Sequence, residues 1–261
     1  MPMTVPQIKA LLDKADYQEF KSLERALSAD PRKGVASALK SASKRLEAQR
    51  AEHERLQSLY AFERQFVDRA DGLLVGLDEV GRGSVAGPLA VGAVVLPTDT
   101  LIEGLDDSKK IKPERRTEIA KSIKGIAIAW TVVYIEPNEI DRDGMTISLR
   151  RAFEMAVGRI DEAVDGISVV LIDGNPLHID ERERNVVKGD AKCASIAAAS
   201  IIAKTERDRL MTERSSLYPS YQFDVNKGYA SPQHIEAIRQ HGLSPQHRAS
   251  FCRSFLQETL F

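Results

Sequence analysis

The stretch LLVGLDEVGRGSVAGPLAVGAVVLP, residues 73–97, places a glycine-rich turn between two strand-like apolar runs. The first run carries the acidic pair Asp78 and Glu79 near its end, and the second starts directly after Pro88. Two kinds of site fit such a stretch: a glycine-rich loop that holds the phosphates of a nucleotide, or a strand end that holds carboxylates around a metal ion. The two kinds of site predict different proteins.

The segment after the glycines disfavours the phosphate loop. Gly81, Gly83 and Gly87 come close to a dinucleotide fingerprint, but that fingerprint must open a helix, whose N-terminus holds the phosphates. After Pro88 the chain reads as a second strand instead, and it has no Gly-Lys-Ser/Thr of a P-loop. A nucleotide-binding oxidoreductase therefore remains only an alternative.

The order of elements around this stretch predicts an α/β fold. Residues before about 70 read as charged amphipathic helices, and from residue 72 strands alternate with helices. Closely joined strands are expected to be antiparallel and the later ones parallel to the first, which gives a mixed sheet flanked by helices. We expect an N-terminal helical extension over 1–69 and an α/β domain with C-terminal helices over 70–261. Strands are expected at 73–80, 89–97, 125–136, 166–174 and within 183–190, and helices at 147–160, 191–213 and 232–242.

Overall composition limits which binding partners and which cellular compartment the sequence favours. The formal net charge of −1 gives no global attraction to nucleic acid, so such binding must come from local basic patches. Bases outnumber acids between Arg32 and Arg55, which fits a duplex contact or a solvated helix face. Cys193 and Cys252 lie far apart, and no signal peptide or bilayer-spanning run is visible. We expect a cytoplasmic protein with no membrane partner, and a monomer by default.

Two further acids join the pair in the opening stretch. Asp173 ends the apolar run VVLID, and Asp190 follows a short strand and precedes an Ala-rich helix. If the strands are neighbours, their carboxylates meet at one edge of the sheet. Clustered carboxylates cannot all stay ionised without a cation, and oxygen ligands favour Mg²⁺ or Mn²⁺, which suits phosphoryl hydrolysis. Each acid also has an ordinary alternative as an edge charge, a turn residue or a helix cap.

Strand geometry makes it difficult for both side chains of the acidic pair to reach one ion, because adjacent residues of a regular strand point to opposite faces. Asp78 and Glu79 therefore reach one ion only with a local distortion near Gly81 and Gly83, or with Glu79 contributing from another angle.

Seven blocks of the sequence resemble, in order and spacing, those of ribonuclease HII. They cover roughly residues 70–258, and the preceding segment resembles the extension of some bacterial members. The blocks are DEVGRG (78–83), DSKK (107–110), LIDGN (171–175), VVKGDA (186–191), SIAAASIIAKTERD (195–208), NKGY (226–229) and HRASF (247–251).

The resemblance implies a ribonuclease H-like fold and an endoribonuclease that cleaves RNA in RNA/DNA hybrids. It also implies nicking of duplex DNA on the 5′ side of an embedded ribonucleotide, with 5′-phosphate and 3′-hydroxyl products. The implied catalytic and Mg²⁺- or Mn²⁺-binding residues are Asp78, Glu79, Asp173 and Asp190.

The resemblance further implies a set of substrate-binding residues. The backbone of Gly81, Arg82 and Gly83 is expected to approach the 2′-hydroxyl, which glycine permits because it has no side chain. Tyr229 is expected to sense the ribonucleotide junction, although a packed loop tyrosine is the ordinary alternative. A block near the backbone phosphates contains Ser108, Lys109 and Lys110, and Ser200 and Lys204 are assigned to support or phosphate contact.

Two positions depart from the family pattern. Ser84 stands where many relatives carry proline, so we expect a looser turn, and Ala230 stands where glycine is frequent. Neither touches an acid. Besides the oxidoreductase, the alternatives are another nuclease, resolvase or integrase of the same fold and a non-catalytic nucleic-acid binder that uses the basic helix at 32–55.

Overall fold

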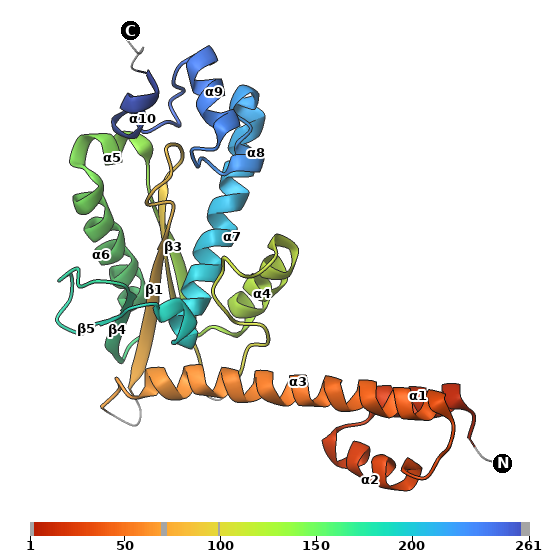
Figure 1. Ribbon diagram of the computed structural model, residues 1–261. Helices are drawn as coiled ribbons and strands as arrows, with labels where there is room; N and C mark the ends of the chain where they lie inside the picture. The colour runs from red at the N-terminus through yellow and green to blue at the C-terminus, as the bar shows by residue number, and fades with distance from the viewer. Residues whose placement is uncertain (1–2, 69–71, 99, 257–261) are drawn as a thin grey trace. The chain divides into compact units, whose positions relative to one another are not determined.

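The computed structural model describes residues 3–68, 72–98 and 100–256 (Figure 1). The chain divides into two compact units, one ending at Gln57 and the other beginning at Ser58. Among the described residues, none of the helices combines the length and the apolar composition needed to span a bilayer.

The first unit is helical, as the sequence predicts. It contains α1 (Val5–Lys14), α2 (Tyr17–Leu27) and most of α3 (Lys33–Arg64), a helix that continues into the second unit. Arg45 on α3 donates to the carbonyl oxygens of Leu12 (3.0 Å) and Ala15 (2.9 Å), which ties the end of α1 to α3. The buried core of this unit consists of Ile8, Leu12, Ala15, Phe20, Val35, Ala38, Ala42 and Leu46.

The second unit is built on the predicted mixed sheet of five strands, in the order β3-β2-β1-β4-β5. The first three strands are antiparallel neighbours, and β4 and β5 join them in parallel, as expected. Their bounds are β1 (Leu73–Val80), β2 (Leu89–Val95), β3 (Ala129–Ile135), β4 (Ile167–Asp173) and β5 (Glu183–Val186). A strand after Pro88 thus stands where a phosphate loop would need a helix, which removes the physical basis of the dinucleotide alternative.

Helices cover both faces of the sheet, which Figure 1 shows nearly edge-on between α6 and α7. The face that carries Val75, Leu77 and Val91 packs on α6 (Met145–Ala163). The other face packs on α7 (Ala194–Leu217), which in turn contacts α4 (Pro113–Ile126). The remaining elements are α5 (Pro137–Asp143), η1 (Gly189–Ala191), η2 (Pro219–Tyr221), α8 (Phe223–Asn226), α9 (Pro232–His241) and α10 (Ala249–Leu256).

The strand predicted at 125–136 is shorter than expected because its first residues belong to α4. That helix was not predicted as such, since its segment reads as a basic run with few apolar residues. Its buried face is made by Arg116 together with Ile119, Ala120 and Ile123.

Two strand glycines let α7 lie unusually close to the sheet. A Cβ atom on Gly76 would stand 2.3 Å from the backbone carbon of Ser195, and one on Gly92 would stand 2.5 Å from the carbonyl oxygen of Ala199. The facing turns of α7 carry mostly alanine and serine, all buried. Small residues on both sides therefore bring the helix backbone next to the strands.

The N-terminus of α7 is capped by a side chain from far away in the sequence. Glu63, near the end of α3, accepts hydrogen bonds from the backbone N–H and the hydroxyl of Ser195, both at 2.8 Å. Only 3% of Glu63 is exposed, and burial raises its pKa to about 7 despite these hydrogen bonds. A buried carboxylate thus satisfies donors that the first turn of a helix leaves open.

Gly92→Ala should destabilise the fold by roughly 1–3 kcal/mol, because the added methyl would overlap the backbone of α7. The control is Gly158→Ala on α6, where the described residues leave the Cβ position open; it should stabilise by roughly 0.5–1 kcal/mol. Thermal melting of the two variants should move in opposite directions. An unchanged melting temperature for Gly92→Ala would contradict the close approach of α7 to β2.

Glu63 should make stability depend on pH. Its folded pKa of about 7 exceeds the ordinary value of 4.5, so its contribution is complete below 4.5 and is lost as pH rises through 7. Glu63→Gln keeps an acceptor but cannot ionise, so it should flatten the curve and gain up to about 3 kcal/mol relative to wild type above pH 7. Denaturant titrations across pH 4.5–8 measure this, with exposed Glu154→Gln as the control. Parallel pH curves for wild type and Glu63→Gln would exclude the effect.

Candidate active site

Parallel pairing of β1 and β4 brings two of the predicted acids to the same end of the sheet. The register pairs Leu77 with Ile172, so Asp78 and Asp173 are the next residues on neighbouring strands. Asp190 lies in η1, between β5 and α7. Electrostatic coupling joins Asp173 to each of the other acids, Asp78, Glu79 and Asp190. The structure therefore gathers the four predicted acids in one region.

Asp78 is held on the α7 side of the sheet. It stands opposite Gly92 in the register and is only 6% exposed. Its Oδ1 accepts from the N–H of Glu79 at 2.7 Å, and the hydroxyl of Ser200 on α7 also hydrogen-bonds its carboxylate. The pKa of Asp78 is raised to about 8, mainly by burial and also by the charges of Glu79 and Asp173, while the Ser200 hydrogen bond opposes the shift.

Glu79 lies on the opposite face, as the alternation of strand residues predicts. Its register partner Val91 belongs to the core that packs on α6. Glu79 and Asp173 line a cavity of about 360 Å³ together with residues of α6 and of the loop after β4. Burial raises the pKa of Glu79, the guanidinium of Arg82 at 3.6 Å opposes the shift, and Asp173 adds to it.

Asp173 also positions Asp190. Its Oδ1 accepts from the N–H of Gly189 at 2.6 Å, which fixes the turn that carries the next residue. Burial raises the pKa of Asp190, followed by repulsion from Asp173 and Asp107, while Lys109 opposes the shift. The N-cap alternative for Asp190 fails, because α7 begins only at Ala194, after Cys193.

This donor set fits a hard divalent cation by its chemistry. It offers carboxylate oxygens only, and three of its members have raised pKa values because burial and mutual repulsion disfavour their charged forms. Within the described residues, no three His, Cys, Asp or Glu side chains already lie in an arrangement that would ligate an ion. An ion would therefore have to draw the carboxylates together. Such a movement is favoured because the positive charge of the ion offsets the repulsion between the carboxylates.

The glycine-rich turn tolerates a side chain differently at Gly81 and at Gly83. Gly81 has φ +86°, and a Cβ there would stand 2.3 Å from Nε of Arg207. At Gly83, in contrast, no atom of the described residues lies within 4 Å of the Cβ position. Packing therefore requires glycine at 81, whereas at 83 the backbone is open to a ligand.

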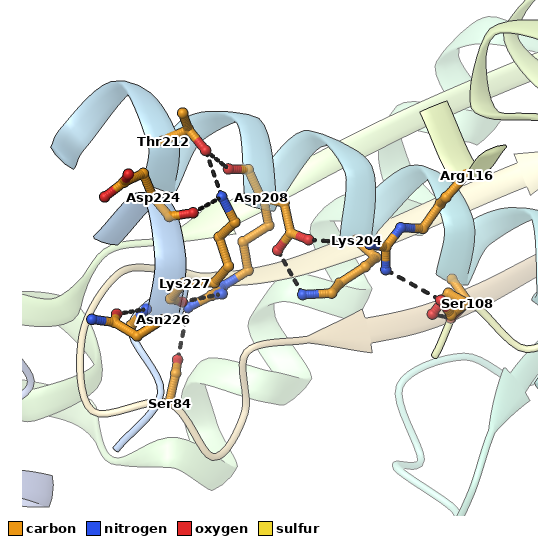
Figure 2. A network of polar contacts seen from close by, with 12 residues as sticks. Ser84, Ser108, Arg116, Lys204, Asp208, Thr212, Asp224, Asn226 and Lys227 are labelled. Atoms are coloured by element: carbon orange, nitrogen blue, oxygen red, sulfur yellow. Dashed lines mark hydrogen bonds and ion pairs between the residues drawn. The ribbon is translucent and has the colours of Figure 1, made fainter. Parts of the chain in front are cut away.

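Ser84 does not loosen the turn, contrary to the sequence expectation. The residue is fully buried, its hydroxyl donates to the carbonyl oxygen of Gly81 at 2.8 Å, and it accepts from Nη2 of Arg207 at 2.8 Å (Figure 2). Arg207 also donates to the carbonyl oxygens of Pro88, Ala86 and Lys227. Hydrogen bonds thus provide the restraint that a proline ring would otherwise give.

Tyr229 lies between α8 and α9 and is 39% exposed. Two cations stand near its ring, Nζ of Lys204 at 5.7 Å and the guanidinium carbon of Arg207 at 5.6 Å from the centroid. Lys204 is in turn paired with Asp208 at 2.6 Å (Figure 2). The ring is therefore held by charged neighbours from α7 while part of its surface stays open.

The Ser108–Lys110 block divides into one buried residue and two lysines. The hydroxyl of Ser108 lies 2.9 Å from that of Ser200, and its carbonyl oxygen accepts from Arg116 at 3.2 Å (Figure 2). Burial lowers the pKa of Lys109, but attraction by Asp190, Asp107 and other acids outweighs it and raises the pKa overall. Lys110 pairs with Asp106 at 3.3 Å. Lys109 is thus the member of the block that faces the acids.

Sequence reasoning missed the buried arginines that organise this region. Arg207 and Arg248 are both fully buried and bind backbone carbonyl oxygens, with Arg248 donating to Gly87 and to Arg82. Both lie within blocks that the sequence singles out. Arginine is mostly found on protein surfaces, so residue type alone does not predict that these two are buried. The only signal in the sequence is that both lie within the seven blocks.

Comparisons with known proteins cover both parts of the chain. A family model described as Ribonuclease HII matches residues 75–254, and one described as Ribonuclease HII N-terminal domain matches residues 4–67. Ribonuclease HII of Ruminiclostridium cellulolyticum is 41% identical over 207 residues, which is 79% of this chain and 80% of that protein. Ribonuclease HII of Clostridium acetobutylicum is 37% identical over 260 residues, which is 97% of this chain and 100% of that protein.

Solved structures share the fold of about 70% of the chain. Ribonuclease H2 from Pyrococcus horikoshii OT3 superposes with a TM-score of 0.60 at 26% identity, over 70% of this chain and 96% of that one. Bst-RNase HIII in complex with Mn²⁺ superposes with a TM-score of 0.61 at 20% identity, over 71% and 69% of the two chains. With these family models and full-length relatives, the chain belongs to the ribonuclease HII family and is an endoribonuclease that hydrolyses RNA in RNA/DNA hybrids.

Proposed function

We propose that Asp78, Glu79, Asp173 and Asp190 hold Mg²⁺ or Mn²⁺ and that the chain also nicks duplex DNA on the 5′ side of an embedded ribonucleotide. The products are a 5′-phosphate and a 3′-hydroxyl. The observation that carries this proposal is the side-by-side placement of Asp78 and Asp173 on paired strands, with Glu79 and Asp190 electrostatically coupled to Asp173. When bound, the cation supplies activation of water and stabilisation of the leaving oxygen.

The chain's own groups orient the acids. The hydroxyls of Ser108 and Ser200 lie 2.9 Å apart, and Ser200 in turn favours the charged carboxylate of Asp78. Asp173 sets the position of Asp190 through the N–H of Gly189. These contacts orient the buried acids, and a bound cation would favour their charged forms.

The surrounding residues supply the contacts to the substrate. The open backbone at Gly83 lets a ribose approach next to Glu79, and the exposed part of the Tyr229 ring offers a flat face to a sugar or base. Lys109 gives positive charge beside the acids for a backbone phosphate, and Lys110, paired with Asp106, adds charge next to it in the chain. Arg82 can approach the same phosphates, because 63% of its side chain is exposed.

The N-terminal helical extension is proposed to aid substrate binding rather than to carry it. Basic side chains on α3 already pair with acids nearby, Arg50 with Glu54 and Arg55 with Glu52, which reduces their attraction for a duplex. Cys193 and Cys252 are buried free thiols, which supports the proposal of a reducing, cytoplasmic location.

The decisive assay uses a duplex with one ribonucleotide beside an all-DNA duplex, with Mg²⁺ or Mn²⁺ and with a chelator. We expect one nick 5′ to the ribonucleotide, and none without metal. Asp78→Asn should lower the rate by more than roughly 100-fold, because it removes a charged ligand of the cation. Its melting temperature should not fall, since the charged Asp78 is disfavoured by burial.

The matched control for this variant is Asp165→Asn, an exposed acid just before the start of β4, which should keep full activity. Equal cutting of the two duplexes would indicate another nuclease of the same fold. Full activity in Asp78→Asn would place the metal elsewhere.

Deletion of residues 1–57 and of residues 1–68 should have different results. The first keeps Glu63 and the apolar residues that pack beside β4 and α7, namely Phe62, Phe66 and Val67, so hydrolysis should survive with weaker binding. The second removes them, and melting should fall by several degrees, at roughly 2–4 °C per kcal/mol. Calorimetry and duplex-binding titrations separate these effects. Loss of all binding on deleting 1–57 would favour the non-catalytic binder.

A further inference from the structure

Two buried histidines face each other behind the Tyr229 loop. His234 lies on α9 and His247 lies just before α10, and they are 1% and 5% exposed. Their Nε2 atoms are 3.0 Å apart. At that distance one nitrogen must carry a hydrogen and the other must present a lone pair.

The outer contacts of the pair determine which nitrogen carries the hydrogen. The backbone N–H of Ser244 can only donate, and it lies 2.9 Å from Nδ1 of His247, so that Nδ1 is bare and Nε2 is protonated. The carbonyl oxygen of Tyr229 can only accept, and it lies 2.8 Å from Nδ1 of His234, so that Nδ1 is protonated and Nε2 is bare. One neutral arrangement therefore satisfies all three contacts.

The surroundings of the pair disfavour a charge on either ring. The ring of Tyr221 lies 4.6 Å from that of His247, and the ring of Phe223 lies 5.5 Å from that of His234. Burial lowers the pKa of both histidines, and burial together with the neighbouring His234 lowers that of His247 to about 4. A proton added to either ring would set two N–H groups against each other.

The pair connects the two loops that flank the substrate in the proposed function. At one end it holds the carbonyl of Tyr229. At the other end, His247 forms a β-bridge with Ala86, and the next residue, Arg248, donates to the carbonyl oxygen of Arg82 at 3.1 Å. The backbone N–H groups of Val85 and Ala86 join the two segments directly by donating to the carbonyl oxygen of Gly228, at 2.9 and 3.0 Å. The two imidazoles add a side-chain connection that ends on Tyr229 itself.

We propose that His234 and His247 are positioning residues that form a directed hydrogen-bond relay, Ser244 N–H to His247 to His234 to Tyr229 C=O, which fixes Tyr229 for recognition of the ribonucleotide. This inference rests on the proposed role of Tyr229 in binding the substrate. The relay touches neither the acids nor the substrate, so it acts on binding through Tyr229.

The relay has a spectroscopic signature that does not depend on activity. Long-range ¹H–¹⁵N correlation spectra of the full chain at neutral pH should show His234 with a proton on Nδ1 and His247 with a proton on Nε2. The chain has five histidines, and His234→Asn and His247→Asn assign the two signals. The same tautomer in both rings, or a charged ring, would overturn the proposal.

Kinetics on the single-ribonucleotide duplex test the consequence. His234→Leu should raise KM about tenfold with a smaller change in kcat, because it removes the hydrogen bonds to the Tyr229 carbonyl and to His247. His234→Asn keeps an amide donor for the Tyr229 carbonyl and should restore most of that loss. The control is His241→Leu, an exposed residue of the same helix, which should behave as wild type.

A double-mutant cycle separates positioning from general packing. If the relay acts through Tyr229, His234→Leu should add little to the KM of Tyr229→Ala. Additive effects would overturn the proposal and leave the proposed function intact. If the wild-type chain does not nick the duplex, the proposed function falls, and the tautomer spectra alone decide whether the relay exists.

Discussion

The close contact between α7 and the centre of the sheet is the constraint on which the site depends. It exists because Gly76 and Gly92 have no side chains and because the facing turns of α7 are built from alanine and serine. Because α7 packs on the sheet at this distance, Ser200 lies next to Asp78, and Arg207 hydrogen-bonds the glycine-rich turn. Lys204, on the same helix, lies beside the ring of Tyr229. One helix thus sets the positions of the acids, the turn and the tyrosine relative to one another.

The same contact explains which predictions from sequence succeed. Strands β1, β2 and β4 are apolar runs bounded by clear turns, so their bounds and directions could be predicted. The alternation along β1 predicts that Asp78 and Glu79 separate to opposite faces, and they do. The family of the chain could also be predicted, because its seven blocks match in order, and the family models confirm it.

Other features could not be predicted, because they depend on partners distant in sequence. Glu63 caps α7 across 132 positions, and nothing local marks that glutamate among the charged residues of α3. Arg207 and Arg248 are buried because backbone carbonyls converge on them, and those carbonyls are ordered only by the tertiary fold. Ser84 was expected to loosen its turn, and the bond from Arg207 reverses that expectation. Roles for the four acids in metal binding remain a prediction.

The pairing of β1 with β4 also has a consequence for synthesis of the chain. The hairpin of β1 and β2 forms between segments a few residues apart, whereas β4 lies about ninety positions beyond its partner β1. Asp190 and the whole of α7 come later still. Contacts of such long sequence separation slow folding. A nascent chain on the ribosome therefore holds Asp78 and Glu79 before Asp173, Asp190 and α7 have been made.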